Sequence, residues 1–143
     1  MYIEIVGYSG IDNDDYKEFL NLRRKIYVDD LGYNKYAEFD GLDNKCDYFL
    51  LKYNKEYVGV LRYTIDNENI IIDRFGILKD YRNKVLGSLL LKFVLDEVKL
   101  SGRKVFLLSS DTKLKYFTNF GFIKTNKKKK FGKKEFEILE LKR

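Results

Sequence analysis

Residues 70–100, IIIDRFGILKDYRNKVLGSLLLKFVLDEVKL, combine the patterns of a strand, a polar turn and an amphipathic helix. Residues 70–77 are rich in β-branched and aromatic side chains, which favour a strand. Residues 79–84 are polar and charged, and residues 86–100 then repeat apolar side chains at helical spacing. A second apolar run, 105–108, follows a short Ser-Gly break. The sequence therefore predicts a β-α-β unit whose two strands are parallel and joined by a right-handed crossover.

The turn between this strand and this helix is suited to binding a phosphate group. The first amides of a helix have no partner within the helix, and the helix dipole adds partial positive charge there. Here these amides belong to residues 84–88, and Arg82 precedes them. Gly87 allows a ligand to approach the backbone closely. We therefore expect a phosphate at the start of the helix.

The same turn resembles motif A of the GNAT superfamily of N-acetyltransferases. In that motif Arg or Gln, two residues, Gly, one residue, and then Gly or Ala follow a strand. The corresponding residues here are Arg82-Asn83-Lys84-Val85-Leu86-Gly87, after Phe75-Gly76-Ile77. Val85 replaces the first glycine. If that glycine needs a positive φ or close phosphate contact, we expect a shifted loop or weaker binding.

Two further segments resemble the same superfamily. Residues 115–122, KYFTNFGF, are similar to motif B, in which a tyrosine stands four positions before Gly-Phe. Phe117 occupies that position, and Tyr116 is adjacent to it. Residues 24–30 and 38–43 are similar to a subgroup that has R-x-x-V-F-V-x-E followed by E-x-D-x-x-D, with Asp30 in place of the first glutamate.

The rest of the chain contains patterns for the other elements of this fold. Before the central unit we expect a strand at 2–8, a helix at 13–28 capped by Asp12, a loop at 33–47, and antiparallel strands at 48–53 and 57–65. After it we expect a helix at 112–119 and strands at 123–126 and 136–141, joined by a loop that contains a lysine run. The resemblance implies one α/β (α+β) domain, residues 1–143. It also implies a mixed, mostly antiparallel sheet of about six to seven strands, a central parallel pair splayed to hold acyl-CoA, and about four helices.

The resemblance implies an N-acetyltransferase that moves an acetyl group from acetyl-CoA to a primary amine of a small molecule or protein through a tetrahedral intermediate, without a metal. The backbone N–H of Ile77 would stabilise the thioester oxygen, and the amides of the helix start would bind the pyrophosphate. The candidate coenzyme-binding residues are Phe75, Ile77, Arg82, Asn83, Lys84, Val85, Leu86, Gly87, Ser88, Asp111 and Phe117.

Several acidic residues are candidates for the acceptor side of such a site. Asp73 and Glu38 are candidate bases that would remove a proton from the amine. Asp40 and Asp43 are candidate acceptor-binding residues, because an acidic loop could select a cationic amine. The alternative is structural: the loop acids would cap turns or face solvent, and Asp73 would pair with Arg62 or Arg74.

The general acid is less evident. Phe117 cannot donate a proton, so Tyr116 is the candidate, although one residue turns a helical side chain by about 100°. Asp111 would contact the coenzyme arm or cap the following helix. Either a tyrosine protonates the leaving thiolate, or amides and water stabilise it.

The composition excludes several classes of function. The chain has no histidine, which removes Ser-His and Cys-His nucleophilic systems and the common zinc sites. Its lone cysteine, Cys46, excludes an internal disulfide and suits a reducing compartment, which predicts a cytoplasmic protein. No apolar run is long enough for a membrane span, and the N-terminus lacks a secretory pattern. We therefore expect no membrane partner, and a homodimer stays open.

The net charge of +6 is concentrated in residues 127–134, which contain six lysines. Without them the basic and acidic residues balance at 22 each, so nucleic acid is not the expected partner. Two alternatives to catalysis remain open. One is a GNAT-fold protein that binds acyl-CoA with little catalysis, because of Val85 and Phe117. The other is a polyanion-binding domain that uses the lysine run.

Overall fold

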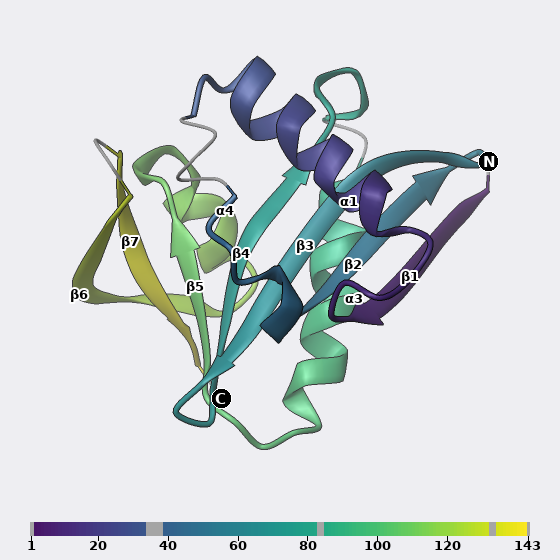
Figure 1. Cartoon of the computed structure of the whole chain (residues 1–143). Coiled ribbons are helices and arrows are strands. Elements are labelled where there is room, and N and C mark those ends of the chain that lie inside the picture. Colours follow the sequence, from purple (N-terminus) through teal and green to yellow (C-terminus); the bar gives the residue numbers. More distant parts are fainter. Residues whose placement is uncertain (1, 34–38, 83–84, 132–133, 143) are drawn as a thin grey trace.

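The computed structural model describes residues 2–33, 39–82, 85–131 and 134–142. A seven-stranded sheet has the strand order β1-β2-β3-β4-β5-β7-β6 (Figure 1). Every neighbouring pair is antiparallel except β4 and β5, which are parallel. The expected mixed sheet with a central parallel pair is therefore confirmed. The strands are β1 (Ile3–Ser9), β2 (Cys46–Tyr53), β3 (Glu56–Asp66), β4 (Asn69–Ile77), β5 (Val105–Ser109), β6 (Phe122–Phe131) and β7 (Lys134–Leu141).

Tight turns join β2 to β3 and β3 to β4. Asn54 and Lys55 have φ values of 49° and 73°, and Asn67 and Glu68 have values of 50° and 68°. Two consecutive residues with positive φ form the turn whose twist matches that of a hairpin, and asparagine tolerates this conformation better than most residues. Both turns lie between strands that the sequence predicts.

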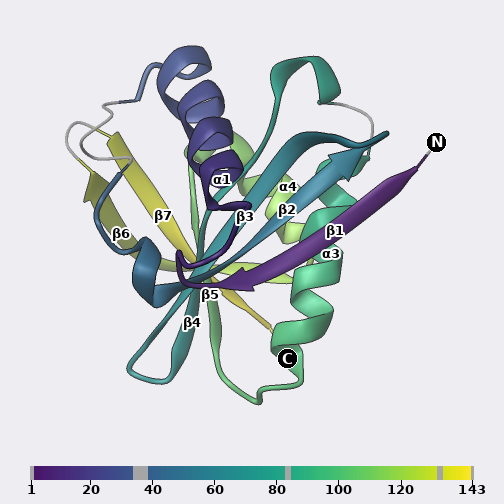
Figure 2. The same ribbon diagram turned by 45° about the vertical axis from the view of Figure 1, so that its right-hand side comes forward.

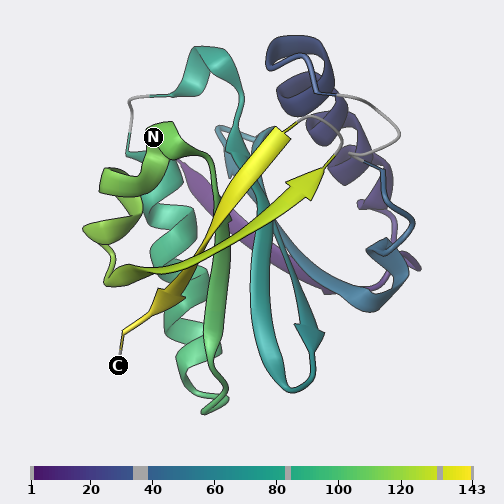
Figure 3. The same cartoon turned by 90° about the vertical axis from the view of Figure 1, so that its left-hand side faces the viewer.

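Helices cover both faces of the sheet. Helix α1 (Tyr16–Arg23) continues as a π-helical segment, Arg24–Asp30, on one face. Helices α3 (Leu86–Lys99) and α4 (Leu114–Thr118) lie on the other face (Figures 2 and 3). Within the described ranges, no helix combines the length and the apolar character that crossing a bilayer requires. Short 3₁₀ turns at Asp43–Lys45, Lys79–Tyr81 and Asp111–Lys113 complete the helical elements.

Each helical layer has its own core. The apolar side of α3 packs on β3, β4, β5 and β7 through buried residues that include Leu61, Ile72, Leu86, Leu90, Val94, Leu107 and Leu139. The apolar side of α1 packs on β2 and β3 through Phe19, Leu22, Ile26, Tyr27, Tyr48, Leu50 and Val60. Because burial of this apolar surface is the main force for folding, the two cores hold both helices rigidly against the sheet.

The N-cap prediction for α1 is wrong by one turn. Asp15, not Asp12, occupies the cap position. The Asp15 carboxylate accepts hydrogen bonds from the Tyr8 hydroxyl and, at 2.9 Å, from the Tyr57 hydroxyl. These contacts with β1 and β3 hold Asp15 against the sheet, and no local sequence signal reports them.

The lysine run lies in a strand, which corrects the prediction of a loop. Lys127–Lys130 belong to β6 and pair with residues 135–138 of β7. Lys128 Nζ lies 3.3 Å from Glu135 Oε1 and 3.7 Å from Glu137 Oε1. Cross-strand acids of this kind offset the repulsion between adjacent lysines and support the pairing.

Strands β4 and β5 separate along their length. They pair over only three residues each, Ile70–Ile72 with Val105–Leu107. Beyond these residues β5 pairs only with β7 and β4 pairs only with β3. The register of β4 with β3 shifts between Val60 and Arg62, so Arg74 and Phe75 oppose one residue of β3. Such a bulge bends a strand, and Arg74 there has a φ of 50°.

Candidate active site

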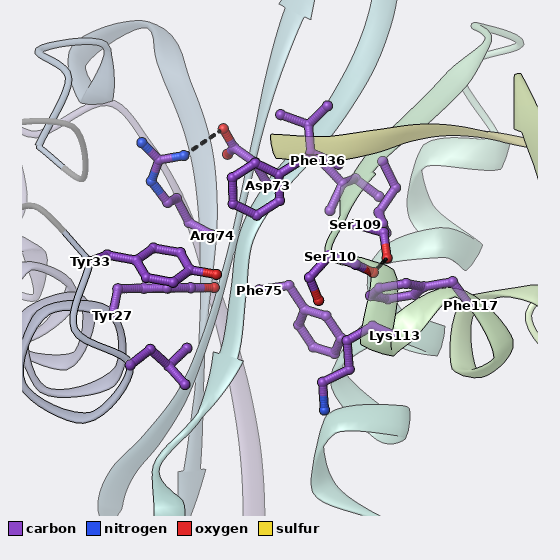
Figure 4. A pocket seen from close by; sticks show the side chains of 14 residues that line it. Tyr27, Tyr33, Asp73, Arg74, Phe75, Ser109, Ser110, Lys113, Phe117 and Phe136 are labelled. Carbon is purple, nitrogen blue, oxygen red and sulfur yellow. Dashed lines mark hydrogen bonds and ion pairs between the residues drawn. The ribbon is translucent and has the colours of Figure 1, made fainter. Parts of the chain in front are cut away.

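A pocket of about 130 Å³ lies where β4 and β5 separate (Figure 4). Tyr27 and Tyr33, from the segment that follows α1, form one wall. Ser110, Lys113 and Phe117, from the segment that follows β5, form the opposite wall, and β4 runs between the two. The other lining residues are Leu31, Ile72, Asp73, Arg74, Phe75, Leu107, Leu108, Ser109 and Phe136. Residues from both faces of the sheet therefore line the pocket.

The backbone of Ile77 is directed toward this separation. Leu78 N–H donates to the Val58 carbonyl at 2.8 Å, so residue 78 is a hydrogen-bonded position of the β3–β4 ladder. In an antiparallel ladder the preceding residue points its N–H and C=O to the opposite edge. Consistently, the Ile77 carbonyl accepts from Arg82 Nε at 2.8 Å rather than from β3. The Ile77 N–H therefore points to the edge that β5 has left, as expected for an oxyanion donor.

The turn before α3 has a left-handed conformation. Val85 is the N-cap residue, with φ 57° and ψ 3°, and 71% of the residue is exposed. This is the conformation for which glycine is preferred. At Gly87 a Cβ would lie 3.5 Å from both Phe75 Cζ and Ile77 Cγ1, which is ordinary van der Waals contact, so the backbone of Gly87 lies close to the end of β4. The Leu86 side chain is buried in the α3 core, so only its amide faces the turn.

Arg82 connects three elements at this turn. Besides its bond to Ile77, its Nη2 lies 2.6 Å from Asp30 Oδ2, at the end of the π-helical segment. It therefore fixes the end of β4 relative to the helix that precedes the pocket wall. Asn83 and Lys84, which we also expect to bind the coenzyme, lie outside the described residues.

The two adjacent aromatic residues of α4 have different positions. Phe117 is buried, lines the pocket and lies 6.1 Å from Phe75 between ring centroids. The Tyr116 hydroxyl instead shares a 2.9 Å hydrogen bond with Ser88 Oγ on the first turn of α3. Asp111 is exposed and does not line the pocket, and the N-cap positions of the 3₁₀ turn and of α4 belong to Ser110 and Lys113. The alternative role of Asp111 as a helix cap is therefore wrong.

The acidic residues converge on Arg62, which is 1% exposed. Arg62 guanidinium nitrogens lie 2.8 Å from both Asp73 carboxylate oxygens, 2.9 and 3.0 Å from those of Asp40, and 3.0 Å from Asp43 Oδ1. The buried Arg23 lies 2.7 Å from Asp43 Oδ2. Asp73 thus forms the ion pair with Arg62 that the structural alternative predicts. Its role as a base stays a prediction. Glu38 lies outside the described residues.

The electrostatics of this cluster favour carboxylates that stay ionised. Burial alone would raise the pKa of Asp40, but the hydrogen bonds and the charge of Arg62 outweigh burial and lower the pKa to about 2. Arg74 lies 3.2 Å from Asp40 and 3.2 Å from Asp73. Arginine thus pairs with all three acids, and the roles of Asp40 and Asp43 in acceptor binding stay predictions.

The sequence did not identify most of the pocket walls. Ser109 and Ser110 follow an apolar strand of the parallel pair, where ligand sites commonly form, so that signal was available. Tyr33 and Phe136 are distant in the chain but have ring centroids 6.1 Å apart. No local pattern predicts that contact.

Comparisons with known proteins agree with this architecture. The family model described as acetyltransferase (GNAT) domain matches residues 27–138. The uncharacterized protein YyaT of Bacillus subtilis is 27% identical over 101 residues, which is 68% of each protein. A putative N-acetyltransferase from Lactobacillus plantarum has a TM-score of 0.85 and 18% identity over 97% of each chain. The PaiA N-acetyltransferase from Thermoplasma acidophilum, solved with coenzyme A, has a TM-score of 0.76 and 17% identity over 100% of each chain. Because the family model covers well over half of the sequence, this chain belongs to the GNAT acetyltransferase family.

Proposed function

We propose that the protein is an N-acetyltransferase that transfers the acetyl group of acetyl-CoA to a primary amine by direct attack. The observation that carries this proposal is the separation of β4 from β5. The pocket lies at this separation, and Phe75 of its lining lies next to Gly87 at the start of α3. A second substrate could enter the same pocket. Membership of the GNAT family supports the same reaction class.

The described residues fit the shape and charge of a coenzyme A molecule. The β5-facing edge of β4 between Asp73 and Ile77 has no strand partner among the described residues, so it can bind the amides of a pantetheine arm as an added strand. Backbone amides at the start of α3 suit the pyrophosphate. Phe75 and Phe117 would flank the arm. The PaiA relative, which has the same fold, was solved in complex with coenzyme A, and this supports binding of the same coenzyme here.

The Ile77 N–H would stabilise the charge that develops during acyl transfer. The amine nitrogen forms a bond to the thioester carbon, and the carbonyl oxygen becomes an oxyanion that this N–H binds. Collapse restores the carbonyl and breaks the carbon–sulfur bond. Coenzyme A leaves as a thiolate and takes up a proton, while the amine loses one.

Asp73 is the one carboxylate among the described pocket residues. We therefore propose that the amine proton passes through water and is finally accepted by Asp73. Asp73 forms ion pairs with Arg62 and Arg74. The amine reacts in its neutral form, because only an unprotonated nitrogen has a free electron pair for the attack. Tyr116 would act on the thiolate only through its bond to Ser88, because its hydroxyl lies outside the pocket lining.

Titration calorimetry with acetyl-CoA, followed by thiol release over a panel of amines, tests the proposal. Cys46 adds little background to a thiol assay, because burial raises its pKa to about 12. Binding and amine-dependent thiol release are expected. Binding without release on any amine would favour the non-catalytic alternative. Absence of binding, with salt-dependent binding to DNA, would favour the polyanion alternative.

A matched pair of substitutions locates the coenzyme. Ser88→Glu places a negative charge in the first turn of α3, where the helix dipole tolerates an acid but a pyrophosphate would be repelled. Ser101→Glu makes the same chemical change beyond the other end of α3. We expect coenzyme affinity to fall at least tenfold in the first variant and to stay unchanged in the second. Equal effects would refute the placement.

A further inference from the structure

Two basic residues, Arg74 and Lys113, are among the described residues that line the pocket. Arg74 forms ion pairs with Asp40 and Asp73, both at 3.2 Å. Lys113 is exposed, and its side chain forms no ion pair with any acid in the described part of the chain. The ammonium group of Lys113 is therefore the pocket cation that can bind an anionic ligand.

The acids on the same side of the sheet do not occupy Lys113. Glu137 is the buried cross-strand partner of the pocket residue Ser109. One of its carboxylate oxygens lies 3.7 Å from Lys128 Nζ, and the other has no hydrogen-bond partner among the described residues. Asp111 lies two residues before Lys113 in the same 3₁₀ turn and is exposed, so solvent screens its charge. An anion that binds Lys113 therefore displaces solvent rather than one of these carboxylates.

Lys113 lies on the side of α4 that faces the start of α3. It is the N-cap residue of α4, and Tyr116 lies three residues further, so the two residues are neighbours on one side of the helix. The Tyr116 hydroxyl shares its 2.9 Å hydrogen bond with Ser88 Oγ in the first turn of α3. Three residues span less than one helical turn, which rises about 5.4 Å. The long side chain of Lys113 can therefore extend its ammonium group to the start of α3.

Phe75 connects the same two regions from the β4 side. Phe75 and Lys113 both line the pocket, and Figure 4 shows Lys113 beside the Phe75 ring, with its Nζ directed away from Asp73. A Cβ at Gly87 would lie 3.5 Å from Phe75 Cζ. The Lys113 side chain thus lies at the end of the pocket that adjoins the backbone amides to which we assign the pyrophosphate.

We propose that Lys113 binds the diphosphate of coenzyme A from the α4 side, opposite the amides at the start of α3. This inference rests on the proposed function and adds a coenzyme-binding residue to it. A lysine binds phosphate as a flexible point charge, so it needs no fixed geometry in the empty site. Because Val85 stands where the family pattern has glycine, a cation on the other wall supplies attraction that does not depend on that turn.

Titration calorimetry with coenzyme A compares the wild type with Lys113→Gln and Lys115→Gln. Lys115 is also exposed, and at two residues from Lys113 it lies about 200° around the helix, so it is the matched control. We expect Lys113→Gln to weaken binding about fivefold, the upper range for one exposed ion pair, and Lys115→Gln to have less than a twofold effect. Lys113→Arg keeps the charge and should retain most of the affinity. Equal effects from the two glutamine variants would overturn the inference.

Dephospho-coenzyme A, which lacks the 3′-phosphate, locates the contact within the ligand. The same fivefold loss with this ligand supports a contact with the diphosphate, whereas a loss confined to coenzyme A places Lys113 at the 3′-phosphate and overturns the inference. Since exposed charges are screened, 0.5 M salt should bring the ratio of the wild-type and Lys113→Gln affinities close to one. A ratio that salt leaves unchanged would indicate lost packing of the lysine stem, and would also overturn it.

Failure of the proposed function gives a different result. If the wild type binds neither coenzyme A nor acetyl-CoA, the proposed function fails and the inference fails with it. Binding by the wild type that Lys113→Gln leaves unchanged overturns the inference alone. An increase in the KM of an amine in Lys113→Gln, with unchanged coenzyme affinity, would assign Lys113 to the acceptor and overturn it as well. The main readout is binding, so it is independent of whether any amine is acetylated.

Discussion

Val85 has a backbone conformation that its side chain disfavours, and its replacement tests how the coenzyme turn is built. Its φ of 57° costs an L-residue about 1–2 kcal/mol, and a β-branched residue is among the least suited to it. With 71% of the residue exposed, burial returns little of this cost. The informative comparison is Val85→Ala with Val85→Gly, because the two variants differ only in Cβ.

We expect the glycine variant at position 85 to be more stable than the alanine variant, which is the reverse of the usual order in a helix. In an ordinary helix position glycine is less stable than alanine by about 0.5–1 kcal/mol, because it loses more backbone freedom on folding. At Val85 the Cβ itself carries a cost of about 1–2 kcal/mol. We therefore expect Val85→Gly to have a free energy of unfolding higher than that of Val85→Ala by about 0.5–1 kcal/mol.

Urea unfolding at 25 °C measures this difference, provided that all variants show the same dependence on denaturant. Lys92→Ala and Lys92→Gly, at an exposed position inside α3, form the control pair, and there alanine should be the more stable variant by about 1 kcal/mol. If Val85→Ala equals or exceeds Val85→Gly, the left-handed turn does not exist in solution, and the proposed phosphate site loses its geometry.

Two further predictions concern the Arg62 cluster. Arg62→Met leaves the buried Asp43 and the half-buried Asp40 and Asp73 without their common partner and should reduce the free energy of unfolding by about 3–5 kcal/mol. Lys92→Met, which removes the exposed Lys92–Asp96 pair, should cost less than about 1 kcal/mol, and a similar loss from both variants would contradict the role of burial. Because the folded pKa of Asp40 lies at about 2, below the value of the unfolded chain, its contribution to stability is present above about pH 4 and is lost as the pH falls toward 2. The stability difference between the wild type and Asp40→Asn should therefore shrink between pH 5 and pH 2.5 in urea unfolding, and a constant difference would contradict the ion pair.

The central unit of the fold could be predicted because its signals are local. The isoleucine run of β4, the polar turn and the leucine spacing of α3 each specify one element, and helix α3 begins at Leu86 as predicted. The hairpin at Asn54 and Lys55 has the same local character, because asparagine favours the required positive φ.

Long-range contacts account for the predictions that were wrong or incomplete. Lysine has a low preference for strands, so the sequence of the lysine run suggests a loop. Pairing with β7 and its acids overrides that preference. The capping position of Asp15 likewise depends on tyrosines from β1 and β3. The convergence of three acids on Arg62 joins the loop before β2 to β3 and β4, which no short window of sequence reveals.

The acidic loop and the lysine run show why the composition of a segment does not give the charge of a site. A buried carboxylate is costly unless a cation pairs with it, so Asp40 and Asp43 pair with Arg62 in the folded protein. A strand directs alternate side chains to opposite faces, so the lysines of β6 are divided between the two faces of the sheet. The charge that meets an acceptor is therefore the charge left after this pairing and alternation.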